Sequence, residues 1–189
     1  MAEDAGQIRT GETLDVEQKA RRRFALAQIR QYPDPSLRMR ANEVTEFDPS
    51  LATLAEKMKA LMLDAQGVGL AATQVGVLRR MFVFSPGEDE VLAVVNPEIL
   101  EQSTDVCTDD EGCLSMQGVL VPVERNVAVT LVGKDVDGSD VRLELGDLAA
   151  RVVQHELDHL DGVLILDRTT PDARREAMAT LREQLSLVR

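Results

Sequence analysis

Two histidines and a glutamate occur in the segment 151–162 at a spacing that suits metal-dependent hydrolysis. His155 and His159 are four residues apart, so on an α-helix their imidazoles lie on one face and can bind one ion. They are the chain's 2 histidines, so chance is a weak explanation for the spacing. Glu156 would lie beside the open position of the metal, where it could deprotonate a water molecule. A helix with solvated or core histidines is the plainer alternative.

A catalytic site of this kind takes three protein ligands and leaves a fourth position for water. With no third histidine, the remaining ligand must be Cys, Asp or Glu. Cys113 follows Gly112, which frees the local backbone, and its thiolate would complete the site. Cys107 lies in a strand-like run and is expected to be structural. Glu111 is either an acceptor that orients a metal-bound imidazole or a solvated acid.

Two other classes of protein use similar residues. A zinc endopeptidase with the same helix motif would take its third ligand from further along the chain as His or Glu, but no histidine follows His159. A structural metal site would be closed by a fourth protein ligand, for which Cys107 is the obvious candidate.

Composition and charge limit the broad class of protein. The chain has 189 residues, of which 44% are hydrophobic, and this length and composition suit a single domain with a sizeable core. The formal net charge of −12 argues against direct nucleic-acid binding. No apolar run of about 18 residues could cross a membrane, and the first residues contain no apolar signal core. We therefore expect a cytoplasmic protein with reduced thiols.

The sequence predicts a polar N-terminal extension over residues 1–23, followed by one domain over residues 24–189. A frayed, solvated extension is favoured over the alternative, a short amphipathic turn over 14–23. Helical periodicity with an Asp48 cap and Pro49 at the first position predicts a helix over 50–65. The small residues of 67–76 allow a close approach to the backbone. A last helix begins at Thr170-Pro171 and is expected to pack on the domain.

The middle of the chain has the pattern of antiparallel β-structure. Turn signals at Pro86-Gly87 and Asn96-Pro97 separate the first runs, and Asp137-Gly138 predicts a hairpin between later ones. The metal helix should begin with Asp147 as its cap and stop at Gly162. The predicted strands are 81–85, 91–95, 99–106, 127–132, 141–145 and 163–166.

Three segments resemble the signature motifs of peptide deformylases in order and spacing. They are Gly67-Val-Gly-Leu-Ala-Ala-Thr-Gln74, Glu111-Gly-Cys-Leu-Ser115 and Gln154-His-Glu-Leu-Asp-His159, and the resemblance covers residues 29–168. It implies an α+β fold, with antiparallel or mixed β-sheets packed around a central metal-binding helix and a C-terminal helix beyond. It also implies removal of the formyl group from N-formylmethionyl nascent peptides, with Fe²⁺ as the physiological metal and Zn, Ni or Co able to replace it.

The resemblance implies a role for each matching residue. The metal ligands would be Cys113, His155 and His159, and Glu156 would be the acid/base that exploits a metal-bound water. The developing oxyanion would be held by the metal, the Leu114 backbone N–H and the Gln74 side chain.

The resemblance also implies which residues contact the substrate. Gly69 would lie beside the substrate backbone, and Val68 and Val152 would line the pocket for the methionine side chain. Because the substrate emerges from the ribosome, the family implies an association near the exit tunnel, for which the last helix is a candidate.

The chain departs from the family's pattern after Cys113. It continues Met116-Gln117-Gly118, without the usual proline, and the segment from Gly118 to Pro122 is shorter than usual. Val123 stands where a basic residue is common, and Arg125 is a candidate replacement. These changes affect the substrate-binding side and leave the predicted ligands intact.

Overall fold

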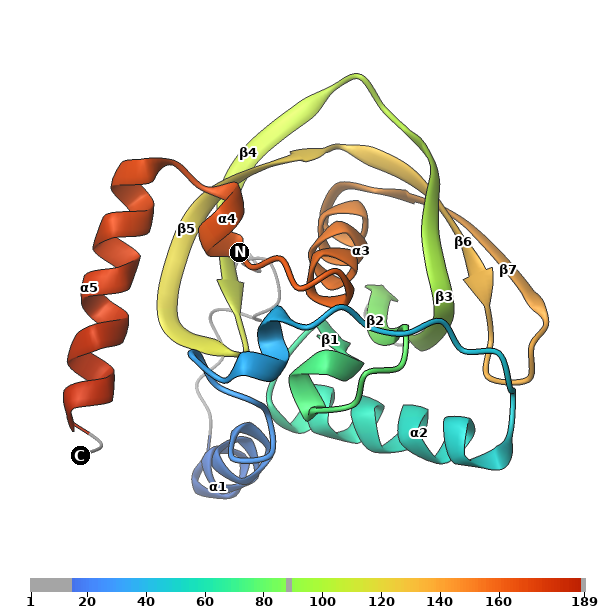
Figure 1. Cartoon of the computed structure of the whole chain (residues 1–189), viewed down its shortest axis with the longest axis horizontal. Helices are drawn as coiled ribbons and strands as arrows, with labels where there is room; N and C mark the ends of the chain where they lie inside the picture. Colours follow the sequence, from blue (N-terminus) through green and yellow to red (C-terminus); the bar gives the residue numbers. More distant parts are fainter. Residues whose placement is uncertain (1–14, 88–89, 188–189) are drawn as a thin grey trace.

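The computed structural model describes residues 15–87 and 90–187. Over these residues the protein has an α+β fold in which helix α3 lies between a five-stranded sheet and a two-stranded hairpin (Figure 1). The helices and 3-10 turns are α1 (Val16–Leu26), η1 (Pro35–Arg38), α2 (Pro49–Asp64), η2 (Ala72–Val75), α3 (Asp147–Leu160), α4 (Ile165–Arg168) and α5 (Pro171–Leu187). The strands are β1 (Gly69–Ala71), β2 (Met81–Gly87), β3 (Glu90–Gln102), β4 (Val106–Cys113), β5 (Met116–Asn126), β6 (Ala128–Lys134) and β7 (Asp140–Gly146). The predicted fold class is confirmed.

The larger sheet has the strand order β1-β2-β3-β6-β7, and each neighbouring pair is antiparallel. Successive side chains of a strand point to opposite faces of its sheet. Met81 and Val83 of β2 accordingly pack with α2, whereas Phe82 and Phe84 pack with α3. The sheet is therefore covered by α2 on one face and by α3 on the other, which explains why β2 is apolar on both.

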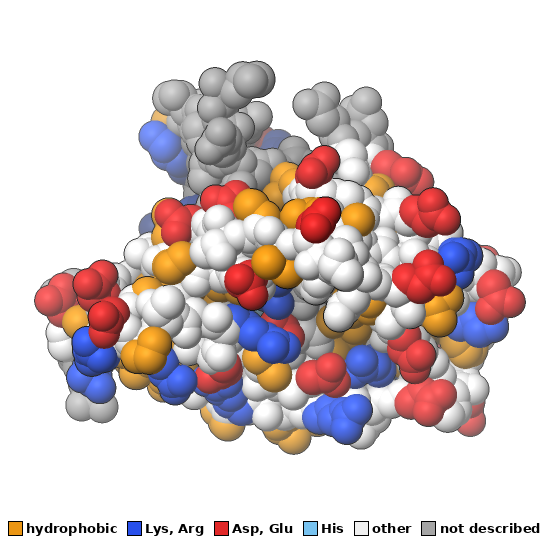
Figure 2. All heavy atoms as spheres, turned by 90° about the horizontal axis from the view of Figure 1, so that it is seen from above, with side chains coloured by type: hydrophobic (Ala, Val, Ile, Leu, Met, Phe, Trp, Pro, Cys, Tyr) orange, Lys and Arg blue, Asp and Glu red, His pale blue; other side chains and the backbone are white. Residues whose placement is uncertain are grey.

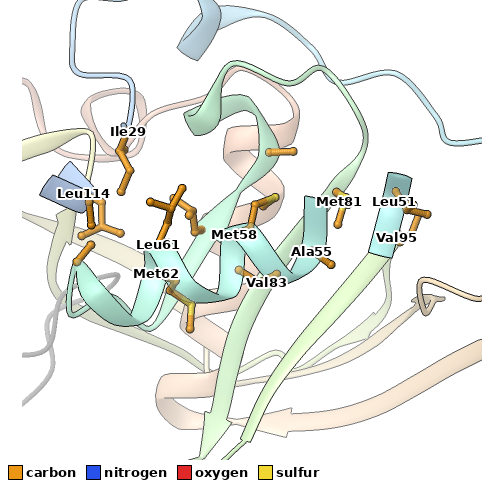
Figure 3. Packing of buried hydrophobic residues seen from close by; sticks show 14 of the residues in the cluster. Ile29, Leu51, Ala55, Met58, Leu61, Met62, Met81, Val83, Val95 and Leu114 are labelled. Atoms are coloured by element: carbon orange, nitrogen blue, oxygen red, sulfur yellow. The ribbon is translucent and has the colours of Figure 1, made fainter. Parts of the chain in front are cut away.

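Helix α2 begins as the sequence predicts. The Asp48 side chain accepts a hydrogen bond of 2.7 Å from the Ser50 N–H, and Pro49 occupies the first helical position. Its apolar stripe is buried against β2 and β3, and Leu114, next to the candidate ligand Cys113, packs at one end of the same cluster (Figure 3). The stripe thus forms core, and that core also supports the candidate site.

The antiparallel pairing predicted for the middle of the chain is confirmed, but several boundaries are wrong. The predicted strand 99–106 is divided, since β3 ends at Gln102 and β4 begins at Val106, and β5 was not predicted. The predicted turn at Asn96-Pro97 lies inside β3, where Asn96 has a φ of +48° and the pairing with β6 shifts register. The Asn96 side chain accepts from the Val44 N–H and donates to the Val44 carbonyl, at 2.9 and 2.8 Å. The turn signal therefore produces a bulge within β3, because the Asn96 side chain is held there by its hydrogen bonds to the distant Val44 backbone. The predicted strand at 163–166 is also wrong, since helix α4 begins at Ile165.

The two ends of the metal helix differ slightly from the prediction. Gly146 is the N-cap residue of α3, and Asp147 is already its first helical residue. At the other end, the helix stops at Leu160 and the chain turns at Gly162, which has a φ of +75°. Gly162 therefore marks the predicted end of the helix. Gly138 likewise has a positive φ, +88°, at the predicted turn of the β6–β7 hairpin.

The N-terminal extension is more ordered than expected. Asp15 forms a capping box with Gln18, and α1 continues to Leu26, which packs with Ala25 against α2. A frayed extension is therefore wrong for residues 16–23. The rest of that prediction, over residues 1–14, lies outside the described residues.

Among residues 15–87 and 90–187, no helix combines the length and the apolar character needed to cross a bilayer. On the face shown in Figure 2, acidic and basic side chains are interspersed.

We expect Gly162→Ala to lower the free energy of unfolding by about 1–3 kcal/mol. The left-handed φ disfavours any side chain, and a Cβ would lie 2.6 Å from the Arg38 carbonyl oxygen. Gly87→Ala is the matched control, because a Cβ there meets no described residue within 4 Å. Urea unfolding of both variants measures the effect, and equal stabilities would contradict it.

Candidate metal centre

The motif-bearing helix α3 is almost surrounded by protein. Both histidines of this 14-residue helix are buried, since His155 is 2% exposed and His159 is 1% exposed. Their rings lie one turn apart, with centroids separated by 4.9 Å and planes at 66°. The predicted spacing therefore brings both imidazoles to one buried face of the helix.

The β4–β5 hairpin brings Cys113 to this face. The strands pair regularly to Gly112, after which the register shifts and Cys113 lies opposite Met116. The chain reverses through Leu114 and Ser115, and Cys113 Sγ lies 3.3 Å from His159 Nε2. The Ser115 N–H donates to this sulfur at 3.4 Å.

Cys113, His155 and His159 form a site that could bind a metal ion. Each offers one ligand atom, and these atoms all lie within 4.8 Å of one another. Nε2 of His155 is buried and has no hydrogen-bond partner within the described chain, an arrangement that normally costs about 1–3 kcal/mol. A cation at this position would use that nitrogen, and a thiolate with two imidazoles is a donor set for a transition metal. The residues present therefore fit such an ion.

Glu111 orients the first imidazole. Its Oε2 accepts a 3.0 Å hydrogen bond from the Nδ1–H of His155, which leaves Nε2 for the metal. The carboxylate also accepts from Arg125 at 2.9 and 3.0 Å and from Arg151 at 2.9 Å. Glu111 is 0% exposed, so the alternative of a solvated acid is wrong.

The local charges shift the pKa values of these groups in opposite directions. Burial raises the pKa of Glu111, but the hydrogen bonds from His155 and Arg125 outweigh it and hold that pKa well below its usual range. Burial lowers the pKa of His155, while Cys113 and Glu111 raise it to about 10 overall. Burial and the neighbouring His155 hold the pKa of His159 well below its usual value.

Arg125 does not take the substrate-side role suggested for it. It is 6% exposed and lies between Glu111 and Asp158. Its Nη1 donates a hydrogen bond of 2.6 Å to the Asp158 carboxylate. Arg168 also donates to Asp158, at 3.0 Å from its Nε. The prediction that Arg125 replaces the basic residue usual at position 123 is therefore wrong, because its guanidinium is held in a buried charge network behind the candidate metal site. The sequence analysis did not identify this network, although Arg151 carries a signal, since it precedes His155 by four residues and so shares its helix face.

Glu156 lies directly against the backbone of β1. A Cβ at Gly69 would overlap Glu156 Oε1 and would approach Val152 Cγ1 to 2.9 Å. Only glycine permits this close approach without displacing the acid. Val68 and Val152 belong to one buried cluster, so the two predicted pocket residues lie in the same part of the core.

Gln74 lies on the other side of the ligands. Its amide nitrogen donates to Ser115 Oγ at 3.0 Å and lies 3.8 Å from Cys113 Sγ, while its oxygen accepts from the Ala71 N–H at 2.9 Å. Leu114 is buried between Cys113 and Ser115. The structure therefore brings the two predicted oxyanion donors next to the thiolate ligand.

Cys107 is separate from this group. It is exposed on β4, and its carbonyl oxygen accepts a 2.8 Å hydrogen bond from Arg151. Among the described residues, the candidate metal site contains no fourth Cys, His, Asp or Glu. The closed structural site with Cys107 as a ligand therefore lacks support.

The two cysteines provide a direct test of the site. Cys113→Ser should lose bound metal, because a hydroxyl is a far poorer ligand than a thiolate. Cys107→Ser should retain it, because that thiol is exposed elsewhere. Metal analysis after anaerobic purification distinguishes the variants, and metal loss in Cys107→Ser would refute the three-ligand assignment.

Comparisons with known proteins agree with one another. The model of the polypeptide deformylase family matches residues 26–175. Peptide deformylase 1 of Corynebacterium glutamicum is 47% identical over 162 residues, which cover 84% of this chain and 96% of that relative. The crystal structure of the Thermotoga maritima peptide deformylase has a TM-score of 0.73 at 46% identity, covering 76% of this chain and 97% of the other. That of the Legionella pneumophila enzyme has a TM-score of 0.79 at 38% identity, covering 84% and 95%. The chain belongs to the polypeptide deformylase family.

Proposed function

We propose that the protein removes the formyl group from the N-terminal formylmethionine of newly synthesised polypeptides. The observation that carries this proposal is the buried group of Cys113, His155 and His159, with Glu156 held beside it against Gly69. Family membership supplies the substrate class, which the geometry of the site does not specify.

Cys113, His155 and His159 would hold one divalent metal ion. When bound, the ion supplies a Lewis acid and lowers the pKa of water towards about 7. We propose Fe²⁺ as the physiological metal, with Zn, Ni or Co able to occupy the site. The mixed thiolate and imidazole donors are compatible with all four.

Glu156 moves the protons in this mechanism. In its position against Gly69, it takes a proton from the attacking water and returns it to the amine nitrogen that leaves. Glu111 supports the reaction indirectly, because it keeps the proton of His155 on Nδ1.

Gln74 and Leu114 stabilise the oxyanion that develops at the formyl carbon. The Gln74 side-chain amide and the Leu114 backbone N–H are the two donors, and one such donor typically contributes about 3 kcal/mol to lowering the barrier. The position of Gln74 Nε2, 3.0 Å from Ser115 Oγ, supports this role. Gly69 contacts the substrate backbone, and Val68 and Val152 line the pocket for the methionine side chain.

The setting of the reaction follows from its substrate. The protein acts in the cytoplasm, on nascent chains near the ribosomal exit tunnel, as one catalytic domain over residues 24–189 that follows the polar extension 1–23. Helix α5 is a candidate ribosome contact, because it lies at the outside of the fold, with Ala177 and Leu181 buried in the cluster that includes β5 residues and Leu185 40% exposed (Figure 1).

Glu156→Gln should retain its metal and lose activity, because the amide keeps the shape of the side chain but cannot carry the proton. General acid–base catalysis contributes about 10²–10⁴-fold, and kcat for formyl-Met-Ala-Ser should fall by that factor. Formate release and metal content are measured on the same sample. A variant with near-normal turnover would remove Glu156 from the mechanism.

Gly69→Ala should also retain metal but displace the acid. A shift of about 1 Å in a catalytic group can reduce the rate about 10²-fold, so kcat/KM for the same peptide should fall to that extent. Gly87→Ala, where a Cβ meets no described residue, should remain fully active. Equal activity in the two variants would show that the contact between Gly69 and Glu156 is unimportant.

A further inference from the structure

A groove beside α1 brings together two parts of the sequence that the proposed mechanism does not use. The α1 groove, about 390 Å³ in volume, is lined by the basic residues of α1 and by the altered segment after Cys113. Its lining includes Lys19, Arg22, Arg23, Leu26, Gln31 and Gln117.

The α1 groove is a local concentration of positive charge on an acidic protein. Within residues 15–87 and 90–187, Lys19, Arg22 and Arg23 form no ion pair, whereas Arg21 pairs with Glu17. At 100° per residue, Arg21 lies on the opposite flank of the helix from the three groove cations. The formal net charge of the protein is −12, so this group of cations stands out, and it suits an anionic occupant.

Two amides link the α1 groove to the turn that follows Cys113. Gln117 Nε2 donates to Gln31 Oε1 at 3.0 Å, and Gln31 Nε2 donates to the Leu114 carbonyl oxygen at 3.0 Å. Leu114 directly follows the ligand Cys113. Gln184 of α5 also holds Gln117 in place by donating to its carbonyl oxygen at 3.0 Å. One wall of the groove is therefore tied to the turn that carries the thiolate ligand and the proposed oxyanion donor.

We propose that the α1 groove receives the part of the substrate peptide that follows its formylated N-terminus, and that it favours acidic side chains there. This inference rests on the proposed function, because a peptide held at the metal centre must lead away from it along the neighbouring surface. Three cations in a groove of this size suit a short acidic segment. The phosphate backbone of an RNA is the competing occupant, and the net negative charge of the protein opposes it.

The test compares three peptides that share formyl-Met-Ala-Ser and continue with Asp-Glu-Asp, Ser-Gly-Ser or Lys-Arg-Lys. At low salt, kcat/KM for the acidic peptide should exceed that for the neutral one about 3- to 10-fold, as expected for a few exposed ion pairs. The difference should lie in KM, because the groove binds ground state and transition state alike, and salt should reduce it. Equal kcat/KM for the three peptides would overturn the inference.

Matched variants locate the effect. Lys19→Gln with Arg23→Gln should abolish the preference, and Lys19→Glu with Arg23→Glu should reverse it in favour of the basic peptide. Arg21→Gln, on the opposite flank, should leave the preference unchanged. All variants should hydrolyse formyl-Met-Ala-Ser at the normal rate, which also shows that they are folded.

The outcomes separate this inference from the proposed function. No formate from formyl-Met-Ala-Ser would refute the proposed function itself. If that peptide is hydrolysed normally but the preference for the acidic peptide survives Lys19→Gln with Arg23→Gln, only the inference about the α1 groove is overturned. Binding of an RNA oligonucleotide that this double variant abolishes, together with no peptide preference, would assign the α1 groove to RNA and overturn the peptide inference.

Discussion

The buried carboxylate of Glu111 is the interaction on which the candidate metal centre depends. It joins the β4–β5 hairpin to α3 by accepting hydrogen bonds from Arg125, Arg151 and His155. Arg151 strengthens this connection, because it also donates to the carbonyl oxygens of Cys107 on β4 and Val123 on β5. An uncompensated charge at this depth would cost several kcal/mol, so the hairpin and the helix are stable only in this relative position.

That position is what brings the ligands together. Cys113 ends β4, while His155 and His159 belong to α3, and the pairing of Glu111 with the helix places the thiolate 3.3 Å from His159. The same carboxylate keeps the proton of His155 on Nδ1. A single buried group therefore sets the geometry of the candidate ligands and the orientation of one imidazole, and the hydrophobic core around Leu114 holds the intervening turn (Figure 3).

Much of this could be predicted from local patterns. The capped helix α2, the hairpin at Gly138 and the helix that carries both histidines follow from capping, turn and spacing rules that involve only neighbouring residues. The failures occur where distant contacts decide. Asn96 and Pro97 continue strand β3, where the Asn96 side chain is hydrogen-bonded to the Val44 backbone. Helix α4 begins at Ile165, within the predicted strand 163–166. The polar start of α1 is ordered by the packing of Ala25 and Leu26.

The sequence by itself determined the chemistry of the site. The residue types and the four-residue spacing of His155 and His159 specify a chelating face, because the α-helix has a fixed period. The structure brings Cys113, the cysteine that the sequence already favoured, to the two histidines. Only the tertiary structure decided that Glu111 is buried behind His155 and that Arg125 lies in the charge network behind the candidate site. These depend on strand register and on the neutralisation of buried charge, which involve residues far apart in the chain and leave no local pattern in the sequence.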